Sequence, residues 1–113
     1  MNMNFKELAG QYINGEWKDG SSSLVMENKN PYNGEIIATY KAANLEDLNA
    51  AYESAQRVQE EWAKTNPVAQ REVFDQAVDY IKENHEAIVD VIIDEIGGTR
   101  LKAEFEIGLV TNM

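Results

Sequence analysis

Hydrophobic and polar positions alternate over short distances in the first third of the chain. Residues 12–17 read Tyr-Ile-Asn-Gly-Glu-Trp, and an Asn-Gly pair between apolar neighbours predicts a tight hairpin, because both central residues of a type I′ turn need positive φ. Residues 24–27 predict a further short strand. At residues 30–34 (Asn-Pro-Tyr-Asn-Gly), proline and the Asn-Gly pair predict a chain reversal, and the apolar run at residues 36–40 predicts a strand after it.

From residue 44 onward the apolar spacing becomes three and four, which indicates helices. Asn44, with Asp47 three residues later, predicts the N-terminus of a helix over residues 45–64. Pro67 at a first helical position predicts a second helix that breaks near residues 83–85, and a third, apolar almost all round, then extends to residue 96. Gly97 provides a left-handed stop, and Thr99 caps a fourth helix.

The helical stripes predict a core. One stripe of the first helix and one of the second are expected to be buried, and five aromatic side chains on helical stripes are expected to be core residues: Tyr52, Trp62, Phe74, Tyr80 and Phe105. The sequence therefore predicts an α+β segment, with a β-rich part at residues 1–43 and a helical part at residues 44–113. The last helix has no glycine, proline or basic residue at its end, so we expect the chain to be truncated.

Composition narrows the possible partners. The chain has 113 residues, a formal net charge of −10 and no cysteine. An acidic surface opposes nucleic-acid backbones and anionic membranes, so we expect neither as a main partner. Neither a signal peptide nor an apolar run of spanning length is visible, and a cytoplasmic location follows as the default expectation. The zero cysteine count excludes disulfides, thiolate metal sites and a cysteine nucleophile within these residues.

Few residues suggest chemistry. His85, the single histidine, lies between Glu83 and Glu86, and we interpret it as a solvated surface residue without a role. The adjacent carboxylate pairs Glu46-Asp47, Glu60-Glu61 and Asp94-Glu95 point about 100° apart on a helix and are interpreted as surface and cap charges. Residues 97–100 (Gly-Gly-Thr-Arg) fit an anion cradle, but a helix C-cap followed by an N-cap explains them more simply.

Three separated motifs resemble the aldehyde dehydrogenase family. Residues 12–17 resemble its early Ile-Asn-Gly-x-Trp hairpin, residues 30–35 its Asn-Pro-x-x-Gly-Glu motif, and residues 44–62 and 71–84 its first two long helices. Residues 95–98 occupy the place of its Glu-Thr-Gly-Lys. The usual Gly-Lys-Pro is replaced by residues 97–103, which resemble the Gly-Ser-Thr-Arg-x-Lys-Ala run of the benzaldehyde and vanillin dehydrogenase branch.

The resemblance implies an α/β family fold of which this chain is the N-terminal part of the cofactor-binding domain. It implies oxidation of an aldehyde, preferably aromatic, with NAD or NADP through a cysteine thiohemiacetal and thioester in a homo-oligomeric full-length protein. No catalytic or cofactor-binding residue is expected in this chain, which alone should be inactive and bind no cofactor.

Four site residues carry over from the resemblance. Asn28 and Glu95 match positions that help hold a structural monovalent cation, and Val110 and Met113 match positions near the substrate entrance. The alternative interpretation is a free-standing acidic helical module that binds a protein partner through an apolar face. A pseudo-enzyme that keeps only this scaffold is the third interpretation.

Overall fold

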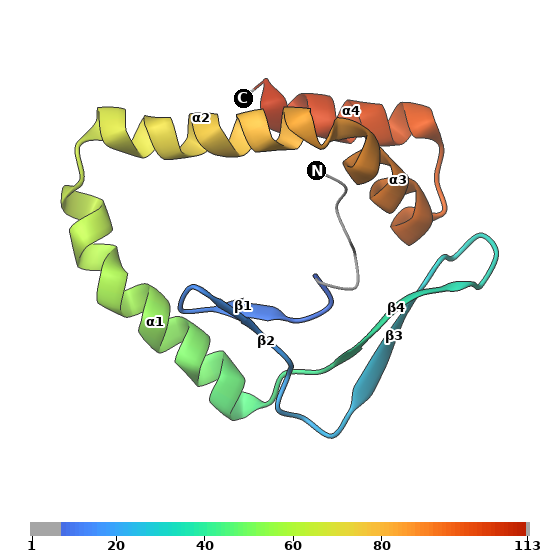
Figure 1. Ribbon diagram of the computed structural model, residues 1–113, viewed down its shortest axis with the longest axis horizontal. Helices are drawn as coiled ribbons and strands as arrows, with labels where there is room; N and C mark the ends of the chain where they lie inside the picture. Colours follow the sequence, from blue (N-terminus) through green and yellow to red (C-terminus); the bar gives the residue numbers. More distant parts are fainter. Residues whose placement is uncertain (1–7, 113) are drawn as a thin grey trace. The chain divides into compact units, whose positions relative to one another are not determined.

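The computed structural model describes residues 8–112 and shows short strands followed by helices (Figure 1). The strands are β1 (Gln11–Ile13), β2 (Glu16–Lys18), β3 (Val25–Lys29) and β4 (Ile36–Lys41), and the helices are α1 (Leu45–Lys64), α2 (Pro67–Glu83), α3 (His85–Ile96) and α4 (Arg100–Thr111). The expected α+β order is confirmed. Within residues 8–112, no helix combines the length and apolar character that crossing a bilayer requires.

The chain divides into two compact units, which are described separately. One unit comprises residues 8–27 and 38–66 of the described chain, and the other comprises residues 28–37 and 67–112. Strands β3 and β4 pair with each other in one two-stranded sheet, and β1 pairs with β2 in another.

The β1–β2 hairpin in the first unit has the turn that its sequence predicts. Asn14 has φ of 54° and Gly15 has φ of 81°, as a type I′ turn requires. The strands are antiparallel, with Tyr12 opposite Trp17, and the two rings lie 5.3 Å apart between centroids. This cross-strand aromatic pair stabilises the register.

Helix α1 is fastened to the same unit by polar contacts. Asn44 and Asp47 form the predicted capping box, in which Asp47 N–H donates to Asn44 Oδ1 over 2.9 Å. Asp47 is therefore the cap charge that the sequence predicts, but it does not lie on the surface, because only 3% of it is exposed. Its carboxylate accepts hydrogen bonds from Ser21 N–H and Ser21 Oγ–H, each 2.7 Å long, and from Gln11 over 3.3 Å. The hydrogen bonds from Ser21 are the main cause that holds the pKa of Asp47 well below its usual range.

The chain reversal at residues 30–35 belongs to the second unit. Asn30 is buried; its Oδ1 accepts from Tyr32 N–H over 2.9 Å, and its carbonyl oxygen accepts from Gly34 N–H over 2.8 Å. Gly34 adopts φ of 77°, which a side chain would strain. The predicted turn is therefore confirmed.

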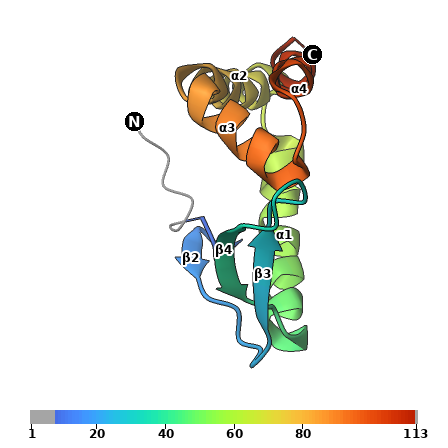
Figure 2. The same ribbon diagram turned by 90° about the vertical axis from the view of Figure 1, so that its right-hand side faces the viewer.

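Helices α2, α3 and α4 form the helical part of this unit, with α2 and α4 side by side and α3 against α4 (Figures 1 and 2). The predicted glycine stop is confirmed, because Gly97 ends α3 with φ of 59°. Thr99 accepts a capping hydrogen bond from Lys102 N–H. Asn112 follows α4, and both its backbone N–H and its side-chain amide donate to the carbonyl of Gly108. The buried core here consists of Val89, Ala103 and Ile107, with Ile81, Ile88, Ile92 and Ile93 packed against it.

The predicted burial of the apolar stripes of α1 and α2 is wrong for most of their residues, although Ile81 of α2 packs against the core. Helix α2 has no buried residue, and the aromatic side chains expected in the core are exposed: Tyr52 by 72%, Trp62 by 41%, Phe74 by 65%, Tyr80 by 49% and Phe105 by 64%. Helical spacing identifies a face that can pack, but it does not show that the partner lies within the same residues. The chain thus presents apolar helix faces to its surroundings.

Candidate functional site

Asn28 and Glu95, which are 67 positions apart in the sequence, meet in the structure. Asn28 lies on β3 and Glu95 in the last turn of α3, and Asn28 Nδ2–H donates to Glu95 Oε1 over 2.8 Å. Asn28 is half-buried and Glu95 is exposed. The two residues singled out for a cation therefore lie together, with the Asn28 amide oxygen and the second Glu95 oxygen as their remaining hard donors.

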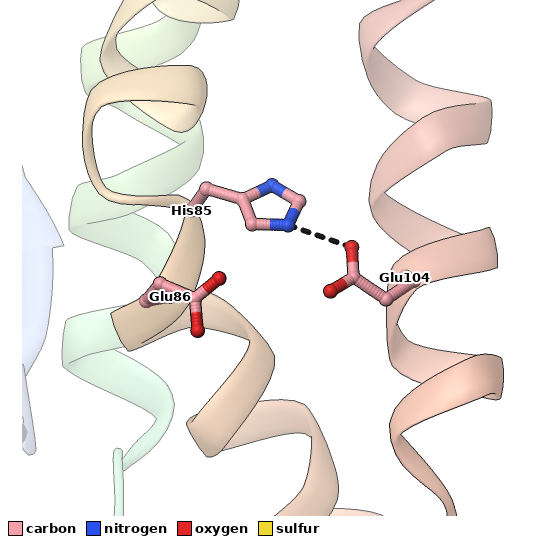
Figure 3. A group of neighbouring side chains, drawn as sticks. All are labelled: His85, Glu86 and Glu104. Carbon is pink, nitrogen blue, oxygen red and sulfur yellow. Dashed lines mark hydrogen bonds and ion pairs between the residues drawn. The ribbon is translucent and has the colours of Figure 1, made fainter.

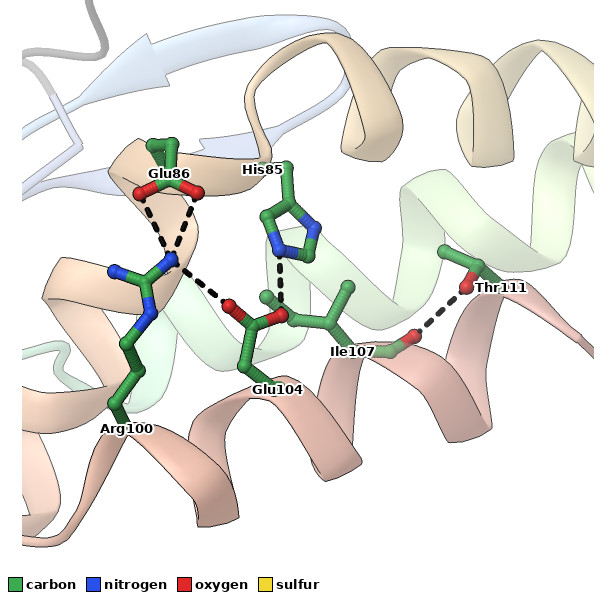
Figure 4. Close-up of polar contacts among 6 residues, drawn as sticks. All are labelled: His85, Glu86, Arg100, Glu104, Ile107 and Thr111. Atoms are coloured by element: carbon green, nitrogen blue, oxygen red, sulfur yellow. Dashed lines mark hydrogen bonds and ion pairs between the residues drawn. The ribbon is translucent and has the colours of Figure 1, made fainter.

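A second polar cluster joins the starts of α3 and α4, and we refer to it as the α3–α4 cluster: His85, Glu86, Arg100 and Glu104. The His85 ring points from the start of α3 toward Glu104 on α4, with 2.6 Å between Nε2 and Oε2 (Figure 3). Arg100 Nη2–H donates to both oxygens of Glu86, over 2.8 and 2.9 Å, and to Glu104 Oε1 over 2.9 Å (Figure 4). Every carboxylate oxygen of the cluster thus accepts a hydrogen bond.

The charges of the α3–α4 cluster stabilise one another. Partial burial alone would raise the pKa of Glu104, but the hydrogen bonds and charges of His85 and Arg100 outweigh it and lower that pKa below its usual value. The hydrogen bond and charge of Glu86 are the main reasons that the pKa of Arg100 is raised. Since an ionised carboxylate can only accept, Nε2 of His85 carries the proton of the bond to Glu104.

The hydrogen bonds of the cluster connect α3 to α4 and leave no position for a metal ion. One ligand atom from each of His85, Glu86 and Glu104 lies within 4.8 Å of the others, a spacing that a metal ion could use. However, the Arg100 guanidinium already contacts both carboxylates and neutralises them, so a metal ion would have to displace it. We therefore interpret the cluster as a connection between α3 and α4.

Sequence reasoning missed this cluster. The sequence predicts His85 to be a solvated surface residue without a role, whereas its side chain is 36% exposed and contacts Glu104, 19 positions away. The spacing of four between Arg100 and Glu104 was the available signal, because residues at that spacing face each other on a helix. No local pattern places Glu104 opposite His85.

An apolar groove of about 230 Å³ lies beside the cluster. Its lining consists of Ile81 from α2, Ile88 and Ile92 from α3, and Glu106, Ile107 and Val110 from α4. Val110, which the resemblance places near a substrate entrance, is 56% exposed and lines this groove. Met113, the other such residue, lies outside the described residues.

This set of residues can bind and position but contains no cysteine nucleophile. The sequence has no cysteine, and the polar atoms of the α3–α4 cluster are engaged with one another. A covalent reaction at an aldehyde carbonyl through a thiolate would therefore need a cysteine that this chain does not contain.

Comparison with known proteins agrees with the motifs. The model of the aldehyde dehydrogenase family matches residues 17–113. The chain is 47% identical to the benzaldehyde dehydrogenase YfmT of Bacillus subtilis over 109 residues, which are 96% of this chain and 22% of that protein. It is 40% identical to the vanillin dehydrogenase of Corynebacterium glutamicum over 89% of this chain and 21% of that protein.

Solved structures give the same result. A crystal structure of an NAD-dependent benzaldehyde dehydrogenase from Corynebacterium glutamicum matches 92% of this chain and 23% of that chain, with a TM-score of 0.88 and 38% identity. A point mutant of betaine aldehyde dehydrogenase from Staphylococcus aureus in complex with NAD+ matches 92% of this chain and 22% of that chain, with a TM-score of 0.83 and 25% identity. The chain spans about a fifth of the length of the curated relatives it matches. On the family match over residues 17–113, this chain belongs to the aldehyde dehydrogenase family.

Proposed function

We propose that the chain forms the N-terminal part of the cofactor-binding domain of an NAD(P)-dependent dehydrogenase that oxidises an aromatic aldehyde to its carboxylic acid. The observation that carries this proposal is the 47% identity to a benzaldehyde dehydrogenase over 96% of the chain. Residues 97–103, which depart from the usual family motif, favour the same aromatic branch. The full-length protein is expected to be a cytoplasmic homo-oligomer without a nucleic-acid partner.

In the proposed reaction a cysteine thiolate of the full-length protein attacks the aldehyde carbonyl and forms a thiohemiacetal. NAD(P), when bound to the full-length protein, would supply the acceptor for the hydride that leaves the thiohemiacetal as it becomes a thioester. Water, activated by a general base, then cleaves the thioester, so that the aldehyde, oxidised cofactor and water give the acid, reduced cofactor and a proton. Because this chain has no cysteine, its own part in the proposed protein is to supply scaffold and one wall of the substrate path.

Val110 and Met113 are proposed to lie near the incoming aldehyde, and of these two the structure describes Val110. The support from the structure is that Val110 lines an apolar groove of about 230 Å³ with Ile107 and Ile81, a lining that suits an aromatic ring. In the full-length protein, Val110→Ala should change the KM ratio between benzaldehyde and acetaldehyde by several-fold. An unchanged ratio would count against a place for Val110 near the substrate.

Asn28 and Glu95 are proposed to hold part of the shell of a structural monovalent cation in the full-length protein. Their contact supports this, and the donor chemistry fits, because the free oxygens of an amide and a carboxylate are hard ligands. The thermal midpoint should be higher in sodium or potassium chloride than in choline chloride at equal ionic strength. Glu95→Gln should remove that difference, and a difference that survives in Glu95→Gln would exclude the site.

The activity itself is tested with the full-length protein that contains this chain. It should reduce NAD+ or NADP+ when given benzaldehyde or vanillin and release the corresponding acid, whereas the 113-residue chain alone should not. Intact mass after trapping with substrate should show an acyl adduct on a cysteine. Absence of reduced cofactor with every aldehyde offered, from a folded full-length protein, would reject the dehydrogenase.

A further inference from the structure

The sequence contains two Asn-Gly pairs, and the structure places each of them in a turn. Asn14-Gly15 joins β1 to β2, and Asn33-Gly34 lies between β3 and β4. Asparagine is a thermolabile residue, and a following glycine has no side chain to hinder attack of its backbone nitrogen on the asparagine amide carbon. Both asparagines are exposed. The two pairs can therefore be compared within one molecule.

The side-chain amide of Asn14 is held by α1, within one compact unit. Ser54 Oγ–H donates to Asn14 Oδ1 over 3.2 Å, and Arg57 Nη2–H donates to the same oxygen over 3.1 Å. Since a guanidinium can only donate, it is the oxygen of the amide that faces α1. A cation and a hydroxyl thus lie beside the atom that becomes negatively charged when a nucleophile adds to the amide carbon, as the donors of an oxyanion hole do.

The nucleophile available to Asn14 is the backbone nitrogen of Gly15. Within residues 8–112, no group accepts a hydrogen bond from Gly15 N–H. Both residues have positive φ, as a type I′ turn requires. The attacking nitrogen is therefore open to solvent base, while the oxygen that it would charge is already contacted by two donors.

The second pair has its reacting groups engaged within its own turn. Gly34 N–H donates to Asn30 O over 2.8 Å, so the nitrogen that would attack is already bonded. Asn33 Oδ1 accepts from Glu35 N–H, and Asn33 Nδ2–H donates to Glu35 Oε2, each over 3.0 Å. These contacts place a carboxylate, and no cation, against the Asn33 amide. The turn thus hinders the reaction that the contacts of Asn14 favour.

We propose that Asn14 is a site of spontaneous deamidation, promoted by Arg57 and Ser54. Hydroxide removes the proton of Gly15 N–H, and the nitrogen forms a bond to Asn14 Cγ, which leaves the negative charge on Oδ1. The Cγ–Nδ2 bond then breaks, and ammonia leaves with a proton from water, which regenerates hydroxide. Water opens the resulting succinimide to aspartate or isoaspartate. The reaction needs no cofactor, and the proposal does not depend on dehydrogenase activity.

The two products affect the β1–β2 hairpin differently. Aspartate keeps the length of the main chain and places a carboxylate opposite the Arg57 guanidinium, with which it can form an ion pair. Isoaspartate adds a methylene group to the main chain inside the turn, where the hairpin register depends on two central residues of positive φ. The isoaspartate product should therefore disturb the register in which Tyr12 lies opposite Trp17.

The test is incubation of the folded full-length protein that contains this chain at neutral pH, with peptide mapping by mass spectrometry at successive times. Asn14 should deamidate at least about tenfold faster than Asn33. In urea, where neither turn persists, the two rates should become similar, because both pairs are followed by glutamate. Equal rates in the folded protein, a faster reaction at Asn33, or no reaction at Asn14 would overturn the proposal.

Variants of α1 test the promoting contacts. Arg57→Met keeps the aliphatic stem but removes the cation, and it should slow deamidation of Asn14 roughly tenfold. Ser54→Ala should slow it less, because a neutral donor stabilises negative charge more weakly. Arg71→Met, at an exposed arginine of α2, is the matched control and should leave the rate unchanged. An unchanged or faster reaction in Arg57→Met would reject the guanidinium as the promoting group.

Discussion

Gly97 lies directly against Tyr32. A Cβ atom on Gly97 would be 2.9 Å from the Tyr32 backbone nitrogen and 3.0 Å from Pro31 Cγ. Gly97 also has φ of 59°, so both its conformation and its surroundings exclude a side chain. The contact joins the glycine that ends α3 to the turn that follows β3, within one compact unit.

Gly97→Ala should therefore lower the free energy of unfolding by about 2 kcal/mol or more, as the left-handed strain alone costs about 1–2 kcal/mol and the backbone contact adds to it. Denaturant unfolding followed by circular dichroism measures the change. Gly108→Ala is the control, since nothing lies within 4 Å of its added Cβ in α4 and alanine favours helix by up to about 1 kcal/mol. Equal effects of the two substitutions would contradict the close packing of Gly97.

Asp47 should make stability sensitive to acid. Its pKa is lowered in the folded state from an ordinary value of 3.8, so its contribution is complete above that value and is lost as the pH falls below it. Unfolding free energies measured from pH 6 to pH 2 should fall less steeply in Asp47→Asn than in the parent chain. Asn44→Ala, which removes a cap without removing the carboxylate, should cost about 1 kcal/mol and keep the acid dependence. An unchanged slope in Asp47→Asn would show that the carboxylate is not held by Ser21.

The α3–α4 cluster gives a second acid-sensitive contact. The pKa of Glu104 is lowered, so its stabilising contribution is present above the usual carboxylate range and disappears as the pH falls through the folded value. A double-mutant cycle with His85→Ala and Glu104→Gln should show coupling at pH 6 that is lost at pH 2. The exposed Lys102–Glu106 pair is the control, and its coupling should be about 0.5 kcal/mol or less. Absence of coupling between His85 and Glu104 at pH 6 would contradict a stabilising contact between these two side chains.

Val89 should dominate the packing of α3. It is fully buried, whereas Val73 on α2 is 51% exposed. Val89→Ala should cost roughly 2 kcal/mol through lost contacts and a cavity, and Val73→Ala should change the unfolding free energy by less than about 0.5 kcal/mol. Chemical denaturation of both variants gives the comparison. Similar losses of unfolding free energy in Val89→Ala and Val73→Ala would show that Val73 on α2 is also buried in solution.

Features governed by neighbouring residues could be predicted from the sequence. The Asn14-Gly15 turn, the Asn44 cap and the Gly97 stop each follow from the conformational preferences of one or two residues. Contacts between distant segments could not be predicted in this way, because no periodicity relates His85 to Glu104. The meeting of Asn28 and Glu95 was expected only through the family resemblance.

Burial was overestimated for a related reason. The apolar stripe of α1 correctly identified one face of the helix, but Leu45 and Tyr52 remain 68% and 72% exposed. The polar side of α1 makes the contacts within its unit, as Asn14 Oδ1 accepts from Ser54 and Arg57. An apolar stripe shows which face of a helix can pack. Whether that face is buried depends on whether another segment packs against it.

In a solution of this polypeptide, the exposed apolar faces of α1 and α2 favour association between copies, whereas the net charge opposes it. A net charge of −10 keeps copies apart at low ionic strength, while side chains such as Tyr52 and Phe74 favour adhesion between them. Added sulfate screens the repulsion and strengthens the adhesion at once. The polypeptide should accordingly salt out at modest sulfate concentrations and bind hydrophobic-interaction resins tightly.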